Sequence, residues 1–174
     1  MTIRPYKNIH PSIGEGTYVD PSAVIIGDTV IGKHCSIWPT VVIRGDMNSI
    51  RIGDYTNIQD GSILHVTHAG EYGPGSPLIV GNYVTIGHKV ILHACTVQDY
   101  SLIGMGTILL DRAIIEPYVI IGAGSLVPEG KILASGYLYF GSPVKKIRAL
   151  TEKEKTFLTY SAETYYQLKN SYIP

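Results

Sequence analysis

The sequence contains little of several residue types on which common protein classes depend. Its 174 residues include two cysteines, one tryptophan and two phenylalanines, and 14 basic residues balance 14 acidic ones. Cys35 and Cys95 are far apart and outside any CxxC motif, which excludes a disulfide-rich scaffold and a cysteine-based zinc cluster. A net charge of zero gives no reason to expect nucleic acid or an anionic membrane as a partner.

The sequence also lacks segments that carry a chain into or across a membrane. No apolar run approaches the roughly 20 residues that a membrane-spanning helix needs. The N-terminus lacks the basic-then-apolar pattern of a secretory signal, so we expect a cytoplasmic protein. The length predicts a single domain, and Cys35 falls in a small inward position, where we expect a buried, reduced thiol.

What the sequence does contain is an aliphatic residue at every sixth position. The series runs Ile13, Val19, Ile25, Ile31, Ile37, Ile43, then Ile52, Ile58, Leu64, then Val80, Ile86, Leu92, and finally Val97, Ile103, Leu109, Ile115, Ile121, Val127. Its phase changes only after multiples of three hexads, as expected for triangular coils with insertions at corners. A short, sustained period of this kind is typical of a parallel β-helix, whose coils must stack to bury their inner faces.

The pattern therefore predicts an all-β solenoid of about six triangular coils within a domain spanning residues 1–141. A β-sandwich would instead alternate with period two and turn every 8–12 residues or so. Residues 1–12 resemble a lead-in strand, and 70–79 form a Gly/Pro-rich loop beside the candidate site. Residues 142–174 carry helical spacing and two capping signals, which predict a short and a longer helix packing on the β-helix or on a neighbour.

Equivalent positions in adjacent coils lie about 4.8 Å apart and form columns. One outward column contains Arg44, His65 and His93, and a second, one side earlier, contains Asp60 and His88. His65 and His93 can converge from neighbouring rungs, whereas His88 faces another way around a convex corner. In a trimer, His88 of one subunit would face the first column of the next subunit. Three histidines would leave a fourth metal position open, as in catalytic zinc sites.

Other polar and aromatic residues lie near these columns. Arg44 is expected to pair with the neighbouring subunit's Asp60 and so to hold Gln59 beside the metal. Tyr165 lies on the apolar face of the last helix, where it packs or extends its hydroxyl into the site. Trp38 is expected at the interface, and His68 in an inward position beside the loop.

Several motifs together resemble one family. They are Arg44-Gly-Asp46, Asn57-Ile-Gln-Asp60, Ile63-Leu-His65, Ile86-Gly-His88 followed by His93, Gly141–Arg148, and Ser161-Ala with Tyr165. Over nearly the whole chain they resemble the γ-class carbonic anhydrases, in particular their short bacterial relatives. The resemblance implies a homotrimer of left-handed β-helices that hydrates CO₂ reversibly to bicarbonate by metal-bound hydroxide.

The resemblance also implies residue roles. His65, His88 and His93 would bind the metal, Gln59 would orient the hydroxide, Asn57 would line the pocket, and Arg44, Asp46 and Asp60 would serve the interface. Imidazole ligands suit Zn²⁺ and also Fe²⁺ or Co²⁺.

The sequence departs from the family pattern directly after Asp46. The acidic residue expected there for proton transfer is Met47, which predicts weak hydratase activity. His68, Glu71 and Tyr165 are nearby substitutes.

Two other functions stay open on the sequence. A hexapeptide-repeat acyltransferase or acyl-CoA thioesterase would need a single essential histidine and no metal. A non-catalytic metal-binding trimer would hold the ion without turnover. Fold alone does not choose among these functions.

Overall fold

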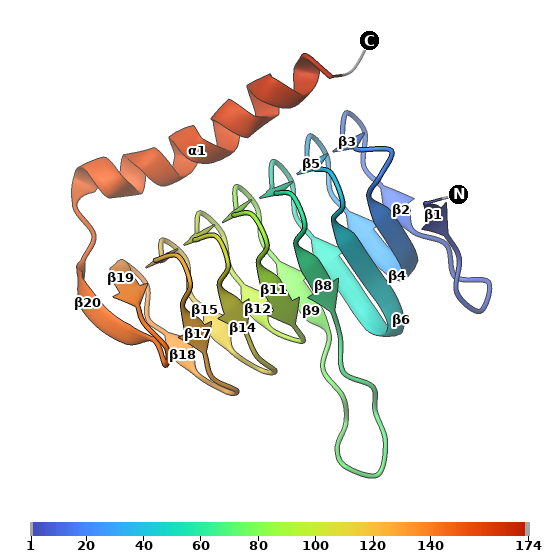
Figure 1. Ribbon diagram of the computed structural model, residues 1–174, viewed down its shortest axis with the longest axis horizontal. Helices are drawn as coiled ribbons and strands as arrows, with labels where there is room; N and C mark the ends of the chain where they lie inside the picture. Colours follow the sequence, from blue (N-terminus) through green and yellow to red (C-terminus); the bar gives the residue numbers. More distant parts are fainter. Residues whose placement is uncertain (1, 173–174) are drawn as a thin grey trace.

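The computed structural model describes residues 2–172 as a parallel β-helix with one α-helix lying along it (Figure 1). The predicted solenoid is confirmed, with about eight turns rather than the six expected. The stack is longer because both ends join it. β1 (Ile3–Arg4) pairs with β4 (Val24–Ile31), and β18 (Ile132–Leu133) and β19 (Tyr137–Phe140) continue the coil beyond residue 132.

Two sheets form the stack, and all coil-to-coil pairs are parallel. The 12-stranded sheet runs β17 (Leu126–Val127), β14 (Ile108–Leu109), β11 (Ile91–His93), β8 (Ile63–His65), β6 (Val42–Ile52), β9 (Leu78–Val80), β12 (Thr96–Val97), β15 (Ile114–Ile115), β18, with β4 on β6 and with β1 and β2 (Ser12–Ile13) on β4. The 8-stranded sheet runs β20 (Lys145–Ala149), β19, β16 (Ile120–Ile121), β13 (Leu102–Ile103), β10 (Thr85–Ile86), β7 (Asn57–Ile58), β5 (Ser36–Ile37), β3 (Tyr18–Val19).

The core follows the hexad prediction. From Ile25 to Val127 every aliphatic residue of the series is at most 4% exposed, and together they form one continuous cluster. Both thiols lie inside it. Burial raises the pKa of Cys35 to about 11 and raises that of Cys95 as well. Neither cysteine is therefore a ready metal ligand or nucleophile.

One insertion leaves the coil as a long loop between β8 and β9 (Figure 1). Val66 is still buried, and the bridge between Thr67 and Ser76 closes the base of the loop. His68 is exposed on this loop. The inward position expected for His68 is therefore wrong, because the chain has already left the coil.

The C-terminal segment differs from the prediction in one respect. The short helix expected after Ser142 is instead β20, which pairs antiparallel with β19. The end of the stack presents unpaired backbone groups, and a strand satisfies them where a helix would not. The longer helix, α1 (Glu152–Asn170), begins at the predicted capping box of Thr151 and Glu154.

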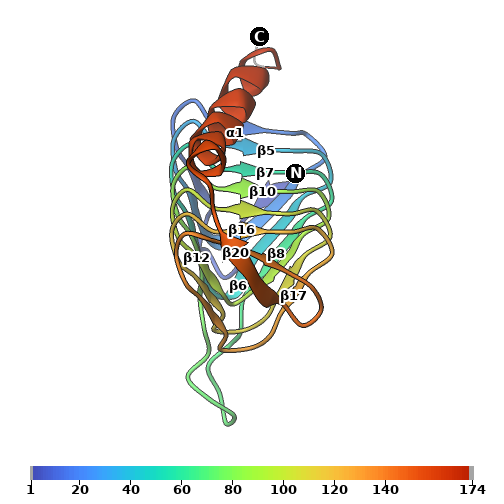
Figure 2. The same cartoon turned by 90° about the vertical axis from the view of Figure 1, so that its left-hand side faces the viewer.

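Helix α1 runs back over the 8-stranded sheet of its own chain and contacts β5, β7 and β10 (Figure 2). Trp38, expected at an interface, lies beneath the helix. It is 6% exposed and its ring packs against Tyr18, Tyr165 and Tyr172. Within residues 2–172 no helix is both long and apolar enough to cross a membrane.

Truncating one inward side chain should lower the stability of the stack strongly. Ile115 is fully buried and Ile132 is 56% exposed. We expect Ile115→Ala to lower the free energy of unfolding by about 2–5 kcal/mol because it leaves a cavity. The matched change Ile132→Ala should cost less than about 1 kcal/mol. Urea denaturation at one fixed protein concentration measures both, and equal losses would contradict the inward assignment.

Candidate metal centre

Two histidines meet on the 12-stranded sheet, on adjacent rungs. β8 and β11 pair with His65 directly opposite His93, as the column analysis predicted. The Nδ1 atom of His65 lies 3.3 Å from the Nε2 atom of His93. Each ring's other nitrogen is already bonded to a carboxylate. His65 Nε2 lies 3.1 Å from Asp46, and His93 Nδ1 lies 2.5 Å from Asp111.

These carboxylates determine which nitrogens carry protons. An ionised carboxylate can only accept, so each ring donates its N–H outward, to Asp46 or to Asp111. The two remaining nitrogens then face one another with lone pairs, an arrangement that a cation between them would stabilise. Carboxylates that orient metal-binding histidines in this way are a regular feature of zinc sites.

The spacing fits a tetrahedral metal. Zn–N bonds of about 2.0–2.1 Å at the tetrahedral angle place two ligand nitrogens about 3.3 Å apart. The two ring nitrogens therefore already have the separation that two zinc ligands require. The donor set, neutral imidazole backed by carboxylate, fits zinc and similar ions.

Burial favours the neutral imidazole of His65. Burial lowers the pKa of His65 below its ordinary value, although the hydrogen bond to Asp46 opposes the shift. For Asp46, burial opposes ionisation, but hydrogen bonds from Arg44 and His65 outweigh it and its pKa is lowered. The pKa of Asp111 is also lowered. Burial would raise it, but hydrogen bonds from Thr67 and His93 outweigh burial.

The third histidine lies elsewhere on the same chain. His88 is half exposed, and its Nδ1 lies 2.8 Å from Asp60. Across residues 2–172, no group of three His, Cys, Asp or Glu side chains could hold a metal ion. Among these residues His10, His34 and His68 form no ion pair with a carboxylate. The carboxylate pairing thus separates the three candidate ligands from the other three histidines.

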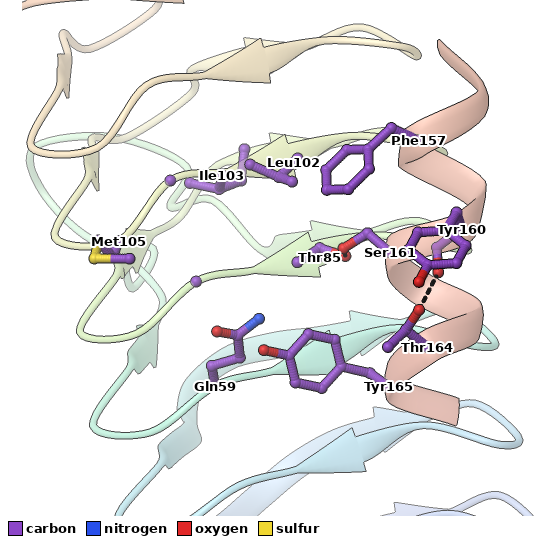
Figure 3. Close-up of a pocket in the computed structure, with 12 residues that line it drawn as sticks. Gln59, Thr85, Leu102, Ile103, Met105, Phe157, Tyr160, Ser161, Thr164 and Tyr165 are labelled. Carbon is purple, nitrogen blue, oxygen red and sulfur yellow. Dashed lines mark hydrogen bonds between the residues drawn. The ribbon is translucent and has the colours of Figure 1, made fainter. Parts of the chain in front are cut away.

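A buried polar network approaches Asp60 and His88 from under α1. Gln59 donates to Asn57 (3.1 Å), and Asn57 donates to Thr85 (3.0 Å). Figure 3 shows the hydroxyl of Tyr165 directed at the Gln59 side chain. Burial raises the pKa of Tyr165, with a smaller contribution from Asp60. Asn57, Gln59 and Tyr165 are therefore brought together, as one wall of the site would require.

Of the remaining predicted residues, Arg44 belongs with the His65–His93 pair and Asp60 with His88. Arg44 pairs with Asp46 of its own chain at 2.6 Å, and Asp60 pairs with His88. The expected contact between Arg44 and a neighbour's Asp60 stays a prediction. Met47 is 53% exposed beside Asp46.

The sequence analysis missed Asp111. It lies 18 residues after His93, one coil further on, and the loop residue Thr67 donates a hydrogen bond to it. The next rung of the histidine column is Leu110, so the column alone did not indicate its neighbour Asp111.

The pKa of His65 offers a direct test. In metal-free protein we expect its imidazole to titrate below 6.5, because burial disfavours the charged ring. Below pH 6.5 the unfolded chain then binds this proton more readily than the folded one, so acidification costs stability. Asp46→Asn removes the carboxylate that opposes the shift and should lower the midpoint further. NMR titration of the ring measures both, and a midpoint that rises in the variant would contradict the assignment.

Comparison with known proteins agrees with the fold. Residues 10–45 match the family model described as bacterial transferase hexapeptide (six repeats). Protein YrdA of Escherichia coli is 55% identical, over 98% of this chain and 94% of its own length. A crystal structure of a hexapeptide transferase family protein from Anaplasma phagocytophilum is 41% identical, with a TM-score of 0.92 over 99% of this chain and 98% of its own.

Several relatives are named carbonic anhydrases. Gamma carbonic anhydrase 2, mitochondrial, of Arabidopsis thaliana is 41% identical over 91% of this chain, which spans 57% of that relative's length. Carbonic anhydrase of Geobacillus kaustophilus is 47% identical over 87% of this chain and 80% of its own length. On these similarities, the chain belongs to the γ-class carbonic anhydrase family of hexapeptide-repeat proteins.

Proposed function

We propose that this protein is a metal-dependent carbonic anhydrase of the γ class that hydrates CO₂ reversibly to bicarbonate. His65 and His93 of one subunit and His88 of the next would hold a zinc-type ion. The observation that carries the proposal is the pairing of each histidine with its own carboxylate, with two ring nitrogens 3.3 Å apart. Family membership supports the same chemistry.

A homotrimer would complete the site, and an apolar column beside the histidines supports it. Val24, Val42, Ile63, Ile91, Ile108 and Leu126 are aligned partners on successive rungs. Ile63 and Ile91 are 45% and 37% exposed, two residues before His65 and His93. A continuous apolar stripe of this kind marks an interface, and a second copy of the chain is the occupant that would also bring His88.

When bound, the metal would supply an acidified water as nucleophile near neutral pH. The chain's own residues would position the reactants. Gln59 is 5% exposed, and its amide nitrogen is committed to Asn57, so its carbonyl oxygen is left to accept a hydrogen bond at the site. Asp46, Asp60 and Asp111 would keep each imidazole in the tautomer that binds metal.

Proton release is where this chain should be slow. Fast hydration needs a titrating group to carry the proton to solvent. Met47 cannot do so, and His68 and Glu71 lie exposed on the loop beyond the coil. We expect activity that depends on buffer concentration, because external buffer would replace the missing group.

The acyltransferase alternative has less support from the site. A general base on a hydroxyl or amine needs one histidine, whereas here three are each paired with a carboxylate. The transferase hexapeptide match covers residues 10–45, before any of the three histidines. A non-catalytic metal-binding trimer would use the same ligands and differs only in turnover.

Stopped-flow CO₂ hydration on protein of known zinc content tests the function. We expect activity proportional to zinc and lost in His88→Ala, with His34→Ala as the matched control. If the protein binds stoichiometric zinc but does not hydrate CO₂ at any buffer concentration, it is not a carbonic anhydrase, and the non-catalytic metal-binding trimer is the remaining function.

Mixed trimers test the shared site in the same assay. His88→Ala and His65→Ala subunits should each form inactive homotrimers. If ligands come from two chains, random mixing by co-refolding restores about a quarter of the interfaces. Recovery of about a quarter of the zinc and activity is expected, and no recovery in trimers shown to be mixed would contradict the arrangement.

A further inference from the structure

A cleft lies between α1 and the coil, apart from the histidine column. Its volume is about 340 Å³, and it opens between the helix and β10 and β13 (Figure 3). Leu102, Met105 and Phe157 form apolar walls, and Ser161 and Tyr165 reach it from the helix. The volume falls in the range of small-molecule pockets.

The cleft contains no charge. None of the twelve residues that line it is acidic or basic. Asp60 lies close enough to Tyr165 to raise the pKa of its hydroxyl, so a negative charge stands near the Tyr165 side of the cleft. An anion would lose its hydration and face a carboxylate. An uncharged ligand avoids this free-energy cost of desolvation.

Backbone packing keeps the hollow open beside Gln59. Gly87 and Gly104 form its floor on adjacent coils. A Cβ on Gly87 would lie 2.8 Å from the Met105 nitrogen, and one on Gly104 would lie 2.5 Å from the Ala123 nitrogen. These contacts are with backbone, which cannot move aside cheaply. The backbone of the next coil therefore excludes a side chain at either of these lining positions.

Polar groups from the sheet and from the helix meet within the cleft. The Ser161 hydroxyl lies 3.0 Å from that of Thr85, and the Tyr165 hydroxyl faces Gln59 (Figure 3). Tyr160 and Thr164 also line the cleft, and the Thr164 hydroxyl is already used in a hydrogen bond to the Tyr160 carbonyl. This is the layout of a site that surrounds an apolar body and orients it with one or two hydrogen bonds.

We propose that this cleft is a binding site for an uncharged organic molecule of about ten non-hydrogen atoms with one hydroxyl or carbonyl group. The size estimate takes about 30 Å³ for each water-sized atom. CO₂ has three atoms and would leave most of this volume empty. Gln59 and Tyr165 also belong to the wall of the proposed metal site, but the cleft does not require the metal, and its test does not depend on CO₂ hydration.

Benzyl alcohol and benzoate are probes of the same shape that differ in charge. We expect benzyl alcohol to shift the methyl NMR signals of Leu102, Ile103 and Met105 in the full chain at saturable concentrations. Benzoate should bind at least about tenfold more weakly because its charge must be desolvated.

Met105→Trp fills the cleft from a side chain that is 58% exposed, so the fold should tolerate it. Ile132→Trp makes the same change at a 56% exposed position outside the cleft. Benzyl alcohol binding should weaken at least about tenfold in the first variant and persist in the second. The Leu102 and Ile103 methyl signals report binding in both variants.

Three results would overturn the inference. They are the absence of saturable shifts with benzyl alcohol, equal binding of benzoate, and full binding in Met105→Trp of unchanged fold by circular dichroism.

Discussion

Parallel register between coils is the constraint on which the rest of this structure depends. Each rung donates and accepts backbone hydrogen bonds with the next, and from Ile25 to Val127 a buried aliphatic residue faces inward at every hexad. A slip of one residue would turn the outward side chains inward, which the core does not allow. The same register that buries Leu64 on Leu92 places His65 opposite His93. The chemistry on the outer face is thus fixed by packing on the inner one.

The coil keeps this register despite insertions of different size. His65 and His93 are 28 residues apart, and a regular coil takes three hexads. The extra residues are expelled into the loop closed by Thr67 and Ser76, and Thr67 in turn bonds to Asp111 behind His93. The base of the loop therefore supports the site next to it. His65 and His93 stay aligned although the insertion lies between them.

Much of the fold was predictable because its period is short and continuous. The hexad phase located the buried residues from Ile25 to Val127, and the capping box of Thr151 located the start of α1. The histidine column followed from the same phase. The contacts that the C-terminal segment makes with the coil of its own chain were harder to predict. The register at the end of the stack made residues 145–149 a strand, and only the folded helix revealed that Trp38 lies beneath it.

Asp111 was missed because nothing near it in the sequence marks it as functional. It belongs to no motif, and its role depends on which way the His93 ring turns. The resemblance supplied Gln59 and Asn57 as site residues, and the pattern of the last helix suggested Tyr165. The structure brings the three together under α1. Periodicity therefore predicts columns well, whereas hydrogen bonds between columns need the three-dimensional structure.

The central claim is that imidazoles from two chains share one metal. X-ray diffraction from zinc-loaded crystals, collected on both sides of the zinc absorption edge, tests it most directly. The account predicts one anomalous peak per subunit interface, about 2.0–2.1 Å from nitrogens of His65, His93 and the adjoining chain's His88, with a fourth position open to solvent. A zinc ion held entirely within one chain, or bound away from His65 and His93, would contradict it.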